Sequence, residues 1–241
     1  MLPEGNSMVK ISIIIPCYNE AETIETVVRR VERVPLAAAR EIIIVDDGST
    51  DGSREIIESG FRGIHTLVLK PENGGKGSAV RAGLEAATGD IIIIQDADLE
   101  LNPSDYLNLL PPLLDGTCDA VYGIRPVVGN GIRHMGHWGN RIAVFMASRV
   151  LSTLITCLYG HYIHDPLIGY KFFRKDALGN HCLLRSKRFE FEAEITAKLL
   201  KRKARIIQKK VFYHPRLLGK KIKWRDSAMI FWSLLKYRFI D

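Results

Sequence analysis

The chain has 241 residues, of which 46% are hydrophobic and 25% are charged, a balance typical of a folded soluble protein. No run of 18 residues is free of charge, and residues 1–10 lack the apolar stretch of a signal peptide, so we expect neither a spanning helix nor a leader. The four cysteines form no CxxC pair, which favours free thiols in a reducing compartment and excludes a disulfide framework. The net charge is +7, which points to an anionic partner.

The first half of the chain alternates between strand and helix patterns. Apolar, β-branched runs predict strands at residues 11–16, 41–47, 65–70, 90–96 and 120–125. Continuous rather than alternating apolar character is typical of parallel strands that are covered on both faces. Helical spacing of apolar residues predicts helices over 19–34 and 76–88, the second stopped by Gly89. The alternation predicts an α/β fold with a mostly parallel, doubly wound sheet flanked by helices.

The second half is less regular. We expect an apolar helix over residues 140–158, an amphipathic helix over 190–203, a strand within 204–214 and a C-terminal helix over 224–239. No repeat, low-complexity segment or linker divides the chain. We therefore expect a flexible N-terminal extension over 1–9 and one domain over 10–241, with residues 210–241 forming a basic tail.

Polar clusters follow three of the predicted strands, at residues 16–20, 46–51 and 96–100. Ligands of open α/β sheets bind beyond the carboxyl ends of the strands, so the three clusters would share one edge. Like charges crowded there would repel one another unless a cation joined them. Mg²⁺ and Mn²⁺ prefer oxygen ligands and take one or two carboxylates plus phosphates, which makes Asp96, Asp98 and Glu100 candidate metal ligands. A lone D-x-D is more often a turn or a helix cap, and the neighbouring clusters are what favour the metal.

A glycine-rich stretch, "ENGGKGSAV", opens the helix predicted from residue 76. Glycines let a backbone approach a phosphate, and a helix N-terminus attracts anions. The stretch does not match GxxxxGK[ST], so it is not a P-loop.

Taken together, "SIIIPCYNEAETI", "IIIVDDGSTDGS", "NGGKGSAVRAGLEAATGDIIIIQDADLE" and "YGIR" resemble the family 2 glycosyltransferases of the GT-A fold. The likeness is strongest to the polyprenyl- and dolichyl-phosphate mannose or glucose synthases, and it covers roughly residues 10–225. The resemblance implies an enzyme that uses a nucleotide-diphosphate sugar and Mg²⁺ or Mn²⁺. It also implies direct displacement with inversion at the anomeric carbon.

The resemblance assigns roles to individual positions. The D-x-D motif, Asp96-Ala97-Asp98, would carry the metal and the diphosphate, with Asp98 as a catalytic residue, and Glu100 stands where mannose synthases usually have glutamine. "HDPLIGYKFFRKDAL" resembles D-x-x-T-G-[FY]-[KR], with Ile168 in place of threonine, and "RFEFEAEI" resembles F-x-x-E-x-E-[IL]. The remaining residues that would hold the donor are Pro16, Tyr18, Glu20, Asp47, Lys76, Arg125 and Arg216.

The acceptor implied by the resemblance is a polyprenyl phosphate. The segment "YHPRLLGKKIKWRD" resembles a basic loop over the phosphates, in which Lys220 and Lys221 would contact the acceptor phosphate. A lipid phosphate is already an anionic nucleophile, so positioning matters more than a strong base. Asp165 would orient acceptor or sugar as a second catalytic residue, although a structural aspartate before Pro166 explains it equally well.

A lipid acceptor also explains the basic C-terminal portion. Between residues 198 and 225 the chain has twelve Lys or Arg and no Asp or Glu, and polybasic segments are attracted to anionic membrane surfaces. The helices over 143–158 and 224–239 would lie in the membrane interface, with Trp224, Trp232 and Tyr237 at head-group level. We therefore expect peripheral attachment at the cytoplasmic face. The alternative is that both helices pack on the sheet or in a homo-oligomer.

Other functions remain open on the sequence alone. A glycosyltransferase of the same fold could act on a soluble sugar, polysaccharide or protein. A nucleotidyltransferase would open with a GxGTR-type loop, which "PCYNE" is not, and a nucleic-acid binder would explain the charge but not the acidic edge. The pairs His134/His137 and His161/His164 lack partners for a closed zinc site, so we expect no zinc. Because a nucleic-acid binder would not explain the acidic edge, we also expect no nucleic-acid partner.

Overall fold

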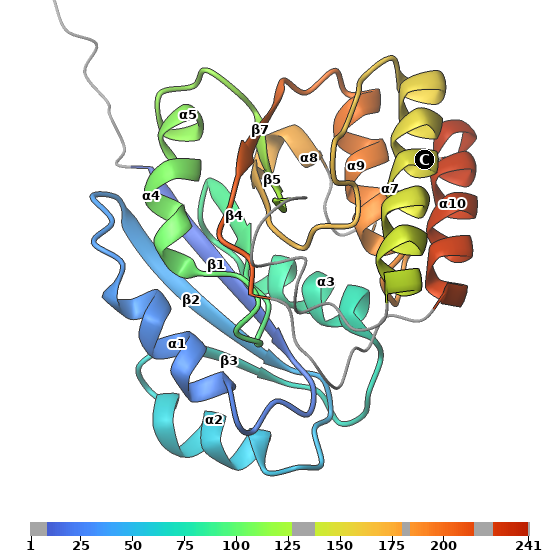
Figure 1. Ribbon diagram of the computed structural model, residues 1–241. Helices are drawn as coiled ribbons and strands as arrows, with labels where there is room; N and C mark the ends of the chain where they lie inside the picture. The colour runs from blue at the N-terminus through green and yellow to red at the C-terminus, as the bar shows by residue number, and fades with distance from the viewer. Residues whose placement is uncertain (1–8, 127–137, 180–183, 215–223, 241) are drawn as a thin grey trace, which may run out of the picture.

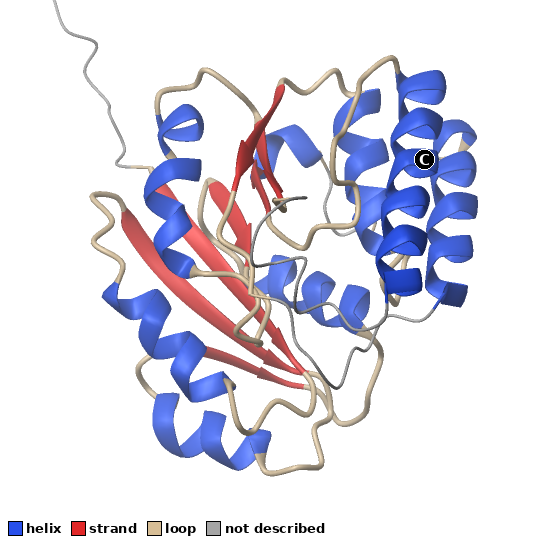
Figure 2. Ribbon diagram, in the orientation of Figure 1, coloured by secondary structure: helices blue, strands red, loops and turns tan. Residues whose placement is uncertain are grey.

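The computed structural model describes residues 9–126, 138–179, 184–214 and 224–240, and of helix residues 138–145 and 224–227 it describes only the backbone. A seven-stranded sheet with the order β3-β2-β1-β4-β6-β5-β7 forms its centre (Figures 1 and 2). All pairings are parallel except those of β6, which runs antiparallel to β4 and β5. The strands are β1 (Lys10–Cys17), β2 (Ala39–Asp46), β3 (Thr66–Leu69), β4 (Ile91–Ile94), β5 (Ala120–Ile124), β6 (Lys171–Arg174) and β7 (Ile206–Lys210).

The apolar runs form the central strands because both faces of the sheet are covered. Side chains alternate between the faces, so Ile13 and Ile15 of β1 enter one apolar cluster while Ile14 enters the other. In β4, Ile91 to Ile94 are all at most 1% exposed. The six strands predicted from the sequence are confirmed, and β6 is an addition.

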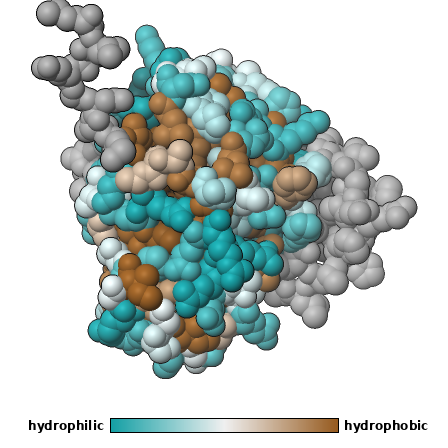
Figure 3. Space-filling view, turned by 90° about the vertical axis from the view of Figure 1, so that its left-hand side faces the viewer, coloured by the Kyte–Doolittle hydropathy of each residue, from teal (hydrophilic) through white to brown (hydrophobic). Residues whose placement is uncertain are grey.

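One face of the sheet is covered by α1 (Ile24–Arg33), α2 (Ser53–Phe61), the 3-10 turn η1 (Pro103–Asp105), α4 (Tyr106–Leu109) and α5 (Pro111–Leu114). Apolar residues at helical spacing on α1 pack inward. Figure 3 views the molecule from the side on which these helices lie in Figure 1. There hydrophilic and hydrophobic residues are interspersed, with a broad hydrophilic area across the middle.

The other face is covered by α3 (Lys76–Ala86), α7 (Trp138–Tyr159), α8 (Lys175–Leu178), α9 (Phe191–Lys201) and α10 (Trp224–Phe239). The sequence predicted an amphipathic helix where α9 lies, but α9 is buried from Phe191 to Leu200. The amphipathic interpretation is wrong because α10 packs over the side of α9 that would otherwise face water (Figure 1). The charges of α9 are satisfied internally, as in the ion pair of Glu194 with Lys198.

The helices α7 and α10 lie side by side at the edge of this layer (Figure 1). Each is buried on one side only: Leu151 and Ile155 of α7 and Ile230 and Leu234 of α10 enter the apolar cluster under the sheet. Within the described ranges, no helix combines the length and apolar character needed to cross a membrane.

Candidate functional site

The candidate site lies at the edge of the sheet where the parallel strands end. The segments after β1, β2, β4, β5 and β7 all leave the sheet there, and β6, which is antiparallel, starts at the same edge. This topology gathers the three polar clusters that the sequence predicts to meet. It adds residues 165–171, which lead into β6, and residues 211–214, which follow β7.

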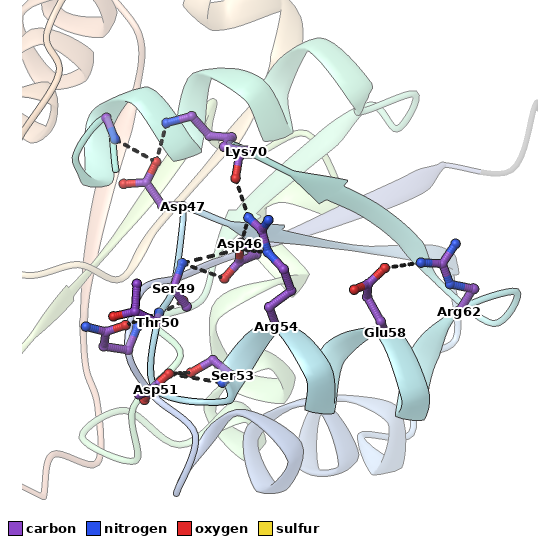
Figure 4. Close-up of polar contacts among 12 residues, drawn as sticks. Asp46, Asp47, Ser49, Thr50, Asp51, Ser53, Arg54, Glu58, Arg62 and Lys70 are labelled. Carbon is purple, nitrogen blue, oxygen red and sulfur yellow. Dashed lines mark hydrogen bonds and ion pairs between the residues drawn. The ribbon is translucent and has the colours of Figure 1, made fainter. Parts of the chain in front are cut away.

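The segment after β2 uses its aspartates to hold the loops around them (Figure 4). Asp46 is fully buried and accepts a hydrogen bond from Arg54 Nε at 2.7 Å. Asp47 is ion-paired with Lys70 and accepts hydrogen bonds from the backbone amides of Gly74 (3.1 Å) and Gly75 (2.8 Å). Asp47, predicted to hold the donor, therefore fixes the glycine-rich loop that precedes α3.

The segment after β1 is tied to its two neighbours. Glu20 donates its amide proton to Ser53 Oγ at 2.8 Å, which binds it to the start of α2. Thr23 Oγ1 donates to the backbone oxygen of Ala97 at 2.8 Å and also lies 3.1 Å from Glu20 Oε2. Glu20 and the D-x-D turn are thus one connected unit. Pro16 is buried inside β1 opposite Val45, and Tyr18 is partly exposed beside it.

Gln95, which sequence analysis did not single out, directly precedes the D-x-D turn and stabilises it through hydrogen bonds. Gln95 is fully buried, and its side-chain oxygen accepts hydrogen bonds from Tyr106 (2.8 Å) and Tyr170 (2.7 Å). Its side-chain nitrogen donates to the backbone oxygen of Asp96 at 3.1 Å. A glutamine at the end of an isoleucine run carries no motif signal, and only the pairing with residues from distant segments shows its role.

Lys76, at the start of α3, forms an ion pair with the first aspartate of the D-x-D turn. Its Nζ lies 2.6 Å from Asp96 Oδ1 and 3.5 Å from Glu192 Oε1. Burial alone would lower the pKa of Lys76, but the negative charges of Asp96 and Glu192 outweigh burial and raise it. The lysine therefore stays charged at the site.

A second buried lysine extends this network. Lys171 is fully buried, and its Nζ lies 2.7 Å from Glu192 Oε2. It also donates to the backbone oxygens of Ile168 and Pro166, which holds residues 165–168 in place. Burial lowers the pKa of Lys171, and the charge of Glu192 opposes that shift. Asp96, Lys76, Glu192 and Lys171 form a chain of alternating charge from the D-x-D turn to the loop before β6.

Of the three carboxylates predicted to hold a divalent cation, Asp96 is ion-paired with Lys76, and Asp98 and Glu100 follow it in the same turn. Asp98 Oδ1 accepts the amide proton of Glu100 at 3.0 Å, and Glu100 Oε2 accepts a hydrogen bond from Tyr213 at 3.1 Å. Both side chains are partly exposed, and both supply the hard oxygen donors that Mg²⁺ and Mn²⁺ prefer. No group of three or more His, Cys, Asp or Glu side chains in the described residues forms a metal cage. The donor set fits a cation whose coordination is completed by phosphate oxygens.

Arg125 and Asp165 form a two-point ion pair beside these carboxylates. Arg125 Nε and Nη2 each lie 2.7 Å from an Asp165 oxygen. Burial opposes ionisation of Asp165, but the charge and hydrogen bonds of Arg125 hold the pKa of the carboxyl below its usual range. The Arg125 guanidinium also lies 5.4 Å from the ring centre of Tyr213. Burial and the nearby Glu100 charge raise the pKa of Tyr213 to about 12, although the positive charge of Arg125 acts in the opposite direction.

The basic residues predicted to contact the phosphates after residue 214 are not among the described residues. Arg216, Lys220 and Lys221 fall outside the described residues, as do His134 and His137. Among described residues, Cys17, Cys118 and Cys157 are free thiols, as expected. Lys171, Glu192 and Tyr213 lie in segments that resemble the family, but their contacts were not predicted because the partners come from segments far away in the sequence.

A mostly parallel sheet that carries a D-x-D turn and paired cations at its carboxyl edge defines a GT-A type sugar-transferring enzyme. The chain belongs to glycosyl transferase family 2, whose family model matches residues 12–181. It is a glycosyltransferase.

The chain is similar to two curated relatives. It is 29% identical over 232 residues to the glycosyltransferase AglJ of Haloferax volcanii, covering 94% of this chain and 71% of that protein. It is 32% identical over 184 residues to the undecaprenyl-phosphate 4-deoxy-4-formamido-L-arabinose transferase of Sodalis glossinidius. That match covers 73% of this chain and 53% of the relative, so the chain spans about half of that longer protein.

Solved structures share the fold. The glucosyl-3-phosphoglycerate synthase of Mycobacterium tuberculosis, crystallised with Mn²⁺, uridine diphosphate and phosphoglyceric acid, matches with a TM-score of 0.72 and 22% identity. The match covers 97% of this chain and 80% of that one. A second structure of the same enzyme matches with a TM-score of 0.71 and 23% identity. At these identities the likeness shows the fold alone.

Proposed function

We propose that this enzyme transfers a hexose from a nucleotide-diphosphate sugar, of the GDP-mannose or UDP-glucose type, to a polyprenyl phosphate at the cytoplasmic membrane face. The reaction would depend on Mg²⁺ or Mn²⁺ and invert the anomeric carbon. The observation that carries the proposal is the carboxyl edge itself, where Lys76 is paired with Asp96 of the D-x-D turn and Tyr213 joins Glu100 to Arg125. Carboxylates for a metal and fixed positive charges for phosphates are what diphosphate departure requires.

The D-x-D turn and the glycine-rich loop support the proposal that the site binds a nucleotide-sugar donor. Asp98, with Glu100, would hold the cation, which when bound neutralises the charge that builds on the departing diphosphate. Lys76 balances Asp96, which removes one of the charges that would repel an anionic ligand. Asp47 keeps the loop at the start of α3 in place, with Tyr18 and Glu20 on the neighbouring strand end. The solved structures crystallised with Mn²⁺ and uridine diphosphate support the same class of donor.

The transfer step would be a direct displacement at the anomeric carbon. The acceptor phosphate oxygen forms the new bond to that carbon while the bond to the diphosphate oxygen breaks, and the leaving diphosphate takes the electron pair. Arg125, held by Asp165, adds positive charge near the departing group. Because both Asp165 oxygens bind Arg125, Asp165 acts here by orienting that arginine.

The acceptor class is supported by chemistry shared among relatives. The Sodalis enzyme is named for undecaprenyl phosphate, and the mycobacterial enzyme is crystallised with phosphoglyceric acid, so both names specify a phosphorylated acceptor. In a polyprenyl phosphate the phosphate oxygen is itself an anionic nucleophile, which needs placement more than deprotonation, whereas 3-phosphoglycerate also has a hydroxyl group that can accept the sugar. The second candidate function is transfer to a small soluble phosphorylated molecule, which the mycobacterial structures favour.

A lipid acceptor is favoured by the outer side of α7 and α10. Met146 and Val150 of α7 and Met229 and Trp232 of α10 are exposed, and a depression of about 320 Å³ between the helices is lined by apolar side chains. Residues 138–159 contain no acid, and Lys236 and Arg238 of α10 are exposed. Apolar side chains next to basic ones suit an anionic membrane interface.

The proposal is tested by incubating the enzyme with radiolabelled UDP-glucose or GDP-mannose, Mn²⁺, and either undecaprenyl phosphate in detergent or 3-phosphoglycerate. We expect label in the organic-extractable product, and label only in the aqueous product would establish the second candidate. A thermal-shift screen of UDP and GDP provides the binding test, since a ligand of the folded state raises its melting temperature. We expect stabilisation by one nucleotide with Mn²⁺, and an equal shift without metal would remove the role of Asp98 and Glu100.

A further inference from the structure

Tyr213 contacts two charged side chains of the site, Glu100, which follows β4, and Arg125, which follows β5. Its hydroxyl group donates a hydrogen bond to Glu100 Oε2 at 3.1 Å. The Arg125 guanidinium lies over the ring of the same tyrosine, 5.4 Å from the ring centre, also interacts with its hydroxyl group, and binds Asp165 through Nε and Nη2. One side chain therefore touches both a candidate metal ligand and the candidate diphosphate-binding arginine.

The backbone around Tyr213 is anchored, so its direction is set by the fold. The amide of Phe212 donates to Asp105 Oδ2 at 2.9 Å, and the amide of His214 donates to the backbone oxygen of Glu100 at 2.8 Å. Tyr213 itself pairs with Leu101 in an antiparallel bridge. The segment after β7 is thus attached on both sides of Tyr213 to the chain that follows the D-x-D turn.

A hydrogen-bond donor behind a metal-binding carboxylate fixes the orientation of that carboxylate. Glutamate has a long, rotatable side chain, and the phenol restrains it without adding charge to the site. The same ring presents its negative face to Arg125, which limits where the guanidinium lies.

We propose that Tyr213 is a positioning residue, which sets the Glu100 carboxylate for the divalent cation through its hydroxyl group and sets Arg125 for the diphosphate through its ring. This inference rests on the proposed function, in which Glu100 and Arg125 serve the donor diphosphate.

The test separates the hydroxyl group from the ring. Tyr213→Phe removes only the hydroxyl, and Tyr213→Leu removes both. Mn²⁺ binding is measured by electron paramagnetic resonance in the presence of saturating UDP or GDP, whichever the unmodified enzyme binds. We expect Tyr213→Phe to weaken Mn²⁺ binding about 10- to 100-fold, the range seen when outer hydrogen bonds to metal ligands are lost. Metal-free nucleotide binding should fall by less than Mn²⁺ binding, because Tyr213→Phe keeps the ring that lies against Arg125.

The ring is tested by kinetics. At saturating Mn²⁺, Tyr213→Leu should lower kcat more than Tyr213→Phe does, because only the leucine variant lacks the aromatic ring that lies against Arg125. Tyr159→Phe is the matched control: it removes a hydroxyl group that donates to the backbone oxygen of Leu234 between α7 and α10, and Mn²⁺ binding should not change.

Two results would overturn the inference. One is Mn²⁺ binding by Tyr213→Phe within twofold of the unmodified enzyme. The other is a loss of Mn²⁺ binding that merely follows a lower unfolding midpoint in urea, since this would assign Tyr213 a structural role. If the unmodified enzyme bound neither Mn²⁺ nor a nucleotide diphosphate, the proposed function would fail as well, so the two failures are distinguishable.

Discussion

Lys76 Nζ lies 2.6 Å from Asp96 Oδ1, so the first carboxylate of the D-x-D turn is neutralised by the protein itself. Glu192 lies on the other side of the same ammonium at 3.5 Å and is itself paired with Lys171. Two acids and two lysines thus alternate in a partly buried row. In the proposed function this arrangement divides the roles of the turn: Asp96 forms an ion pair within the protein, and Asp98 is the proposed ligand of the cation.

Lys76→Met tests that division. The change removes one positive charge and leaves Asp96 and Glu192 facing each other and the incoming diphosphate. At an effective dielectric constant of about 20, one charge at 4–6 Å is worth roughly 3–4 kcal/mol, so a loss of nucleotide affinity of at least tenfold is expected. Isothermal titration with UDP or GDP and Mn²⁺ measures it. Lys10→Met is the control. It breaks the Lys10–Glu41 ion pair (2.7 Å) at the beginning of β1, close to Asp90, and the variant should bind the nucleotide with unchanged affinity.

Gly169 is predicted to be required as a glycine because of its distance from Asp96. A Cβ atom at this position would lie 2.6 Å from Asp96 Oδ2 and 3.4 Å from Lys76 Nζ. Gly169→Ala should therefore push the Asp96 carboxylate away from Lys76 and lower kcat/KM about 10- to 100-fold, the scale of a misplacement of roughly 1 Å. Gly60→Ala on α2 meets no atom within 4 Å and should leave kcat/KM unchanged. Equal activity of the two variants would show that the Asp96–Lys76 geometry is not needed.

Asp165→Asn is expected to destabilise the protein by about 3 kcal/mol at pH 7, because Arg125 would lose its charged partner in a largely buried place. The pKa of Asp165 is lowered in the folded protein, so its contribution is present above the unfolded value of about 3.9 and is lost as the pH falls through the folded pKa. The difference between the two proteins should thus shrink below about pH 4.

Urea unfolding at pH 7, 5 and 3.5 measures this difference. Asp176→Asn is the matched control, since Asp176 is 77% exposed and lies 3.6 Å from Arg174. We expect a change below about 0.5 kcal/mol for it. A pH-independent loss in Asp165→Asn would assign the effect to packing and not to charge.

The central strands were predictable from the sequence because burial on both faces leaves a continuous apolar run that no other local structure explains. The run at Ile91–Ile94 and its polar continuation correctly placed β4 and the D-x-D turn at one edge. β6 was not predictable in this way. It begins with Lys171, whose charge argues against a buried strand, and only the ion pair with Glu192 makes its burial tolerable.

The same limit applies to the site. Sequence motifs identified Asp96 and Lys76 separately, but not their ion pair, because pairing depends on how α3 lies against the D-x-D turn. Helix α9 was predicted as amphipathic from its charges, and those charges are satisfied inside the protein. A local sequence pattern predicts that a segment is helical. It does not predict the partner of a buried charge when that partner lies about a hundred residues away, as Glu192 does from Lys76.

The exposed side of α7 and α10 leads to a prediction about membranes. Val150 and Trp232 are 52% and 68% exposed beside the depression between the helices. The double variant Val150→Ser/Trp232→Ser should bind vesicles of phosphatidylglycerol about tenfold more weakly than the unmodified enzyme, since burying one such apolar side chain is worth roughly 1.5–3 kcal/mol. Co-sedimentation at low ionic strength measures the bound fraction, and binding should weaken as salt rises because the basic residues contribute.

Leu107→Ser is the matched control, because Leu107 is 51% exposed on α4, across the sheet from α7 and α10. It should sediment with vesicles like the unmodified enzyme. Light scattering distinguishes the competing explanation: if the unmodified enzyme were a dimer and the double variant a monomer, this side would be a contact between two copies. Failure of the unmodified enzyme to sediment at low salt would exclude membrane attachment through this surface, while transfer to a small soluble phosphate would remain testable by the same product assay.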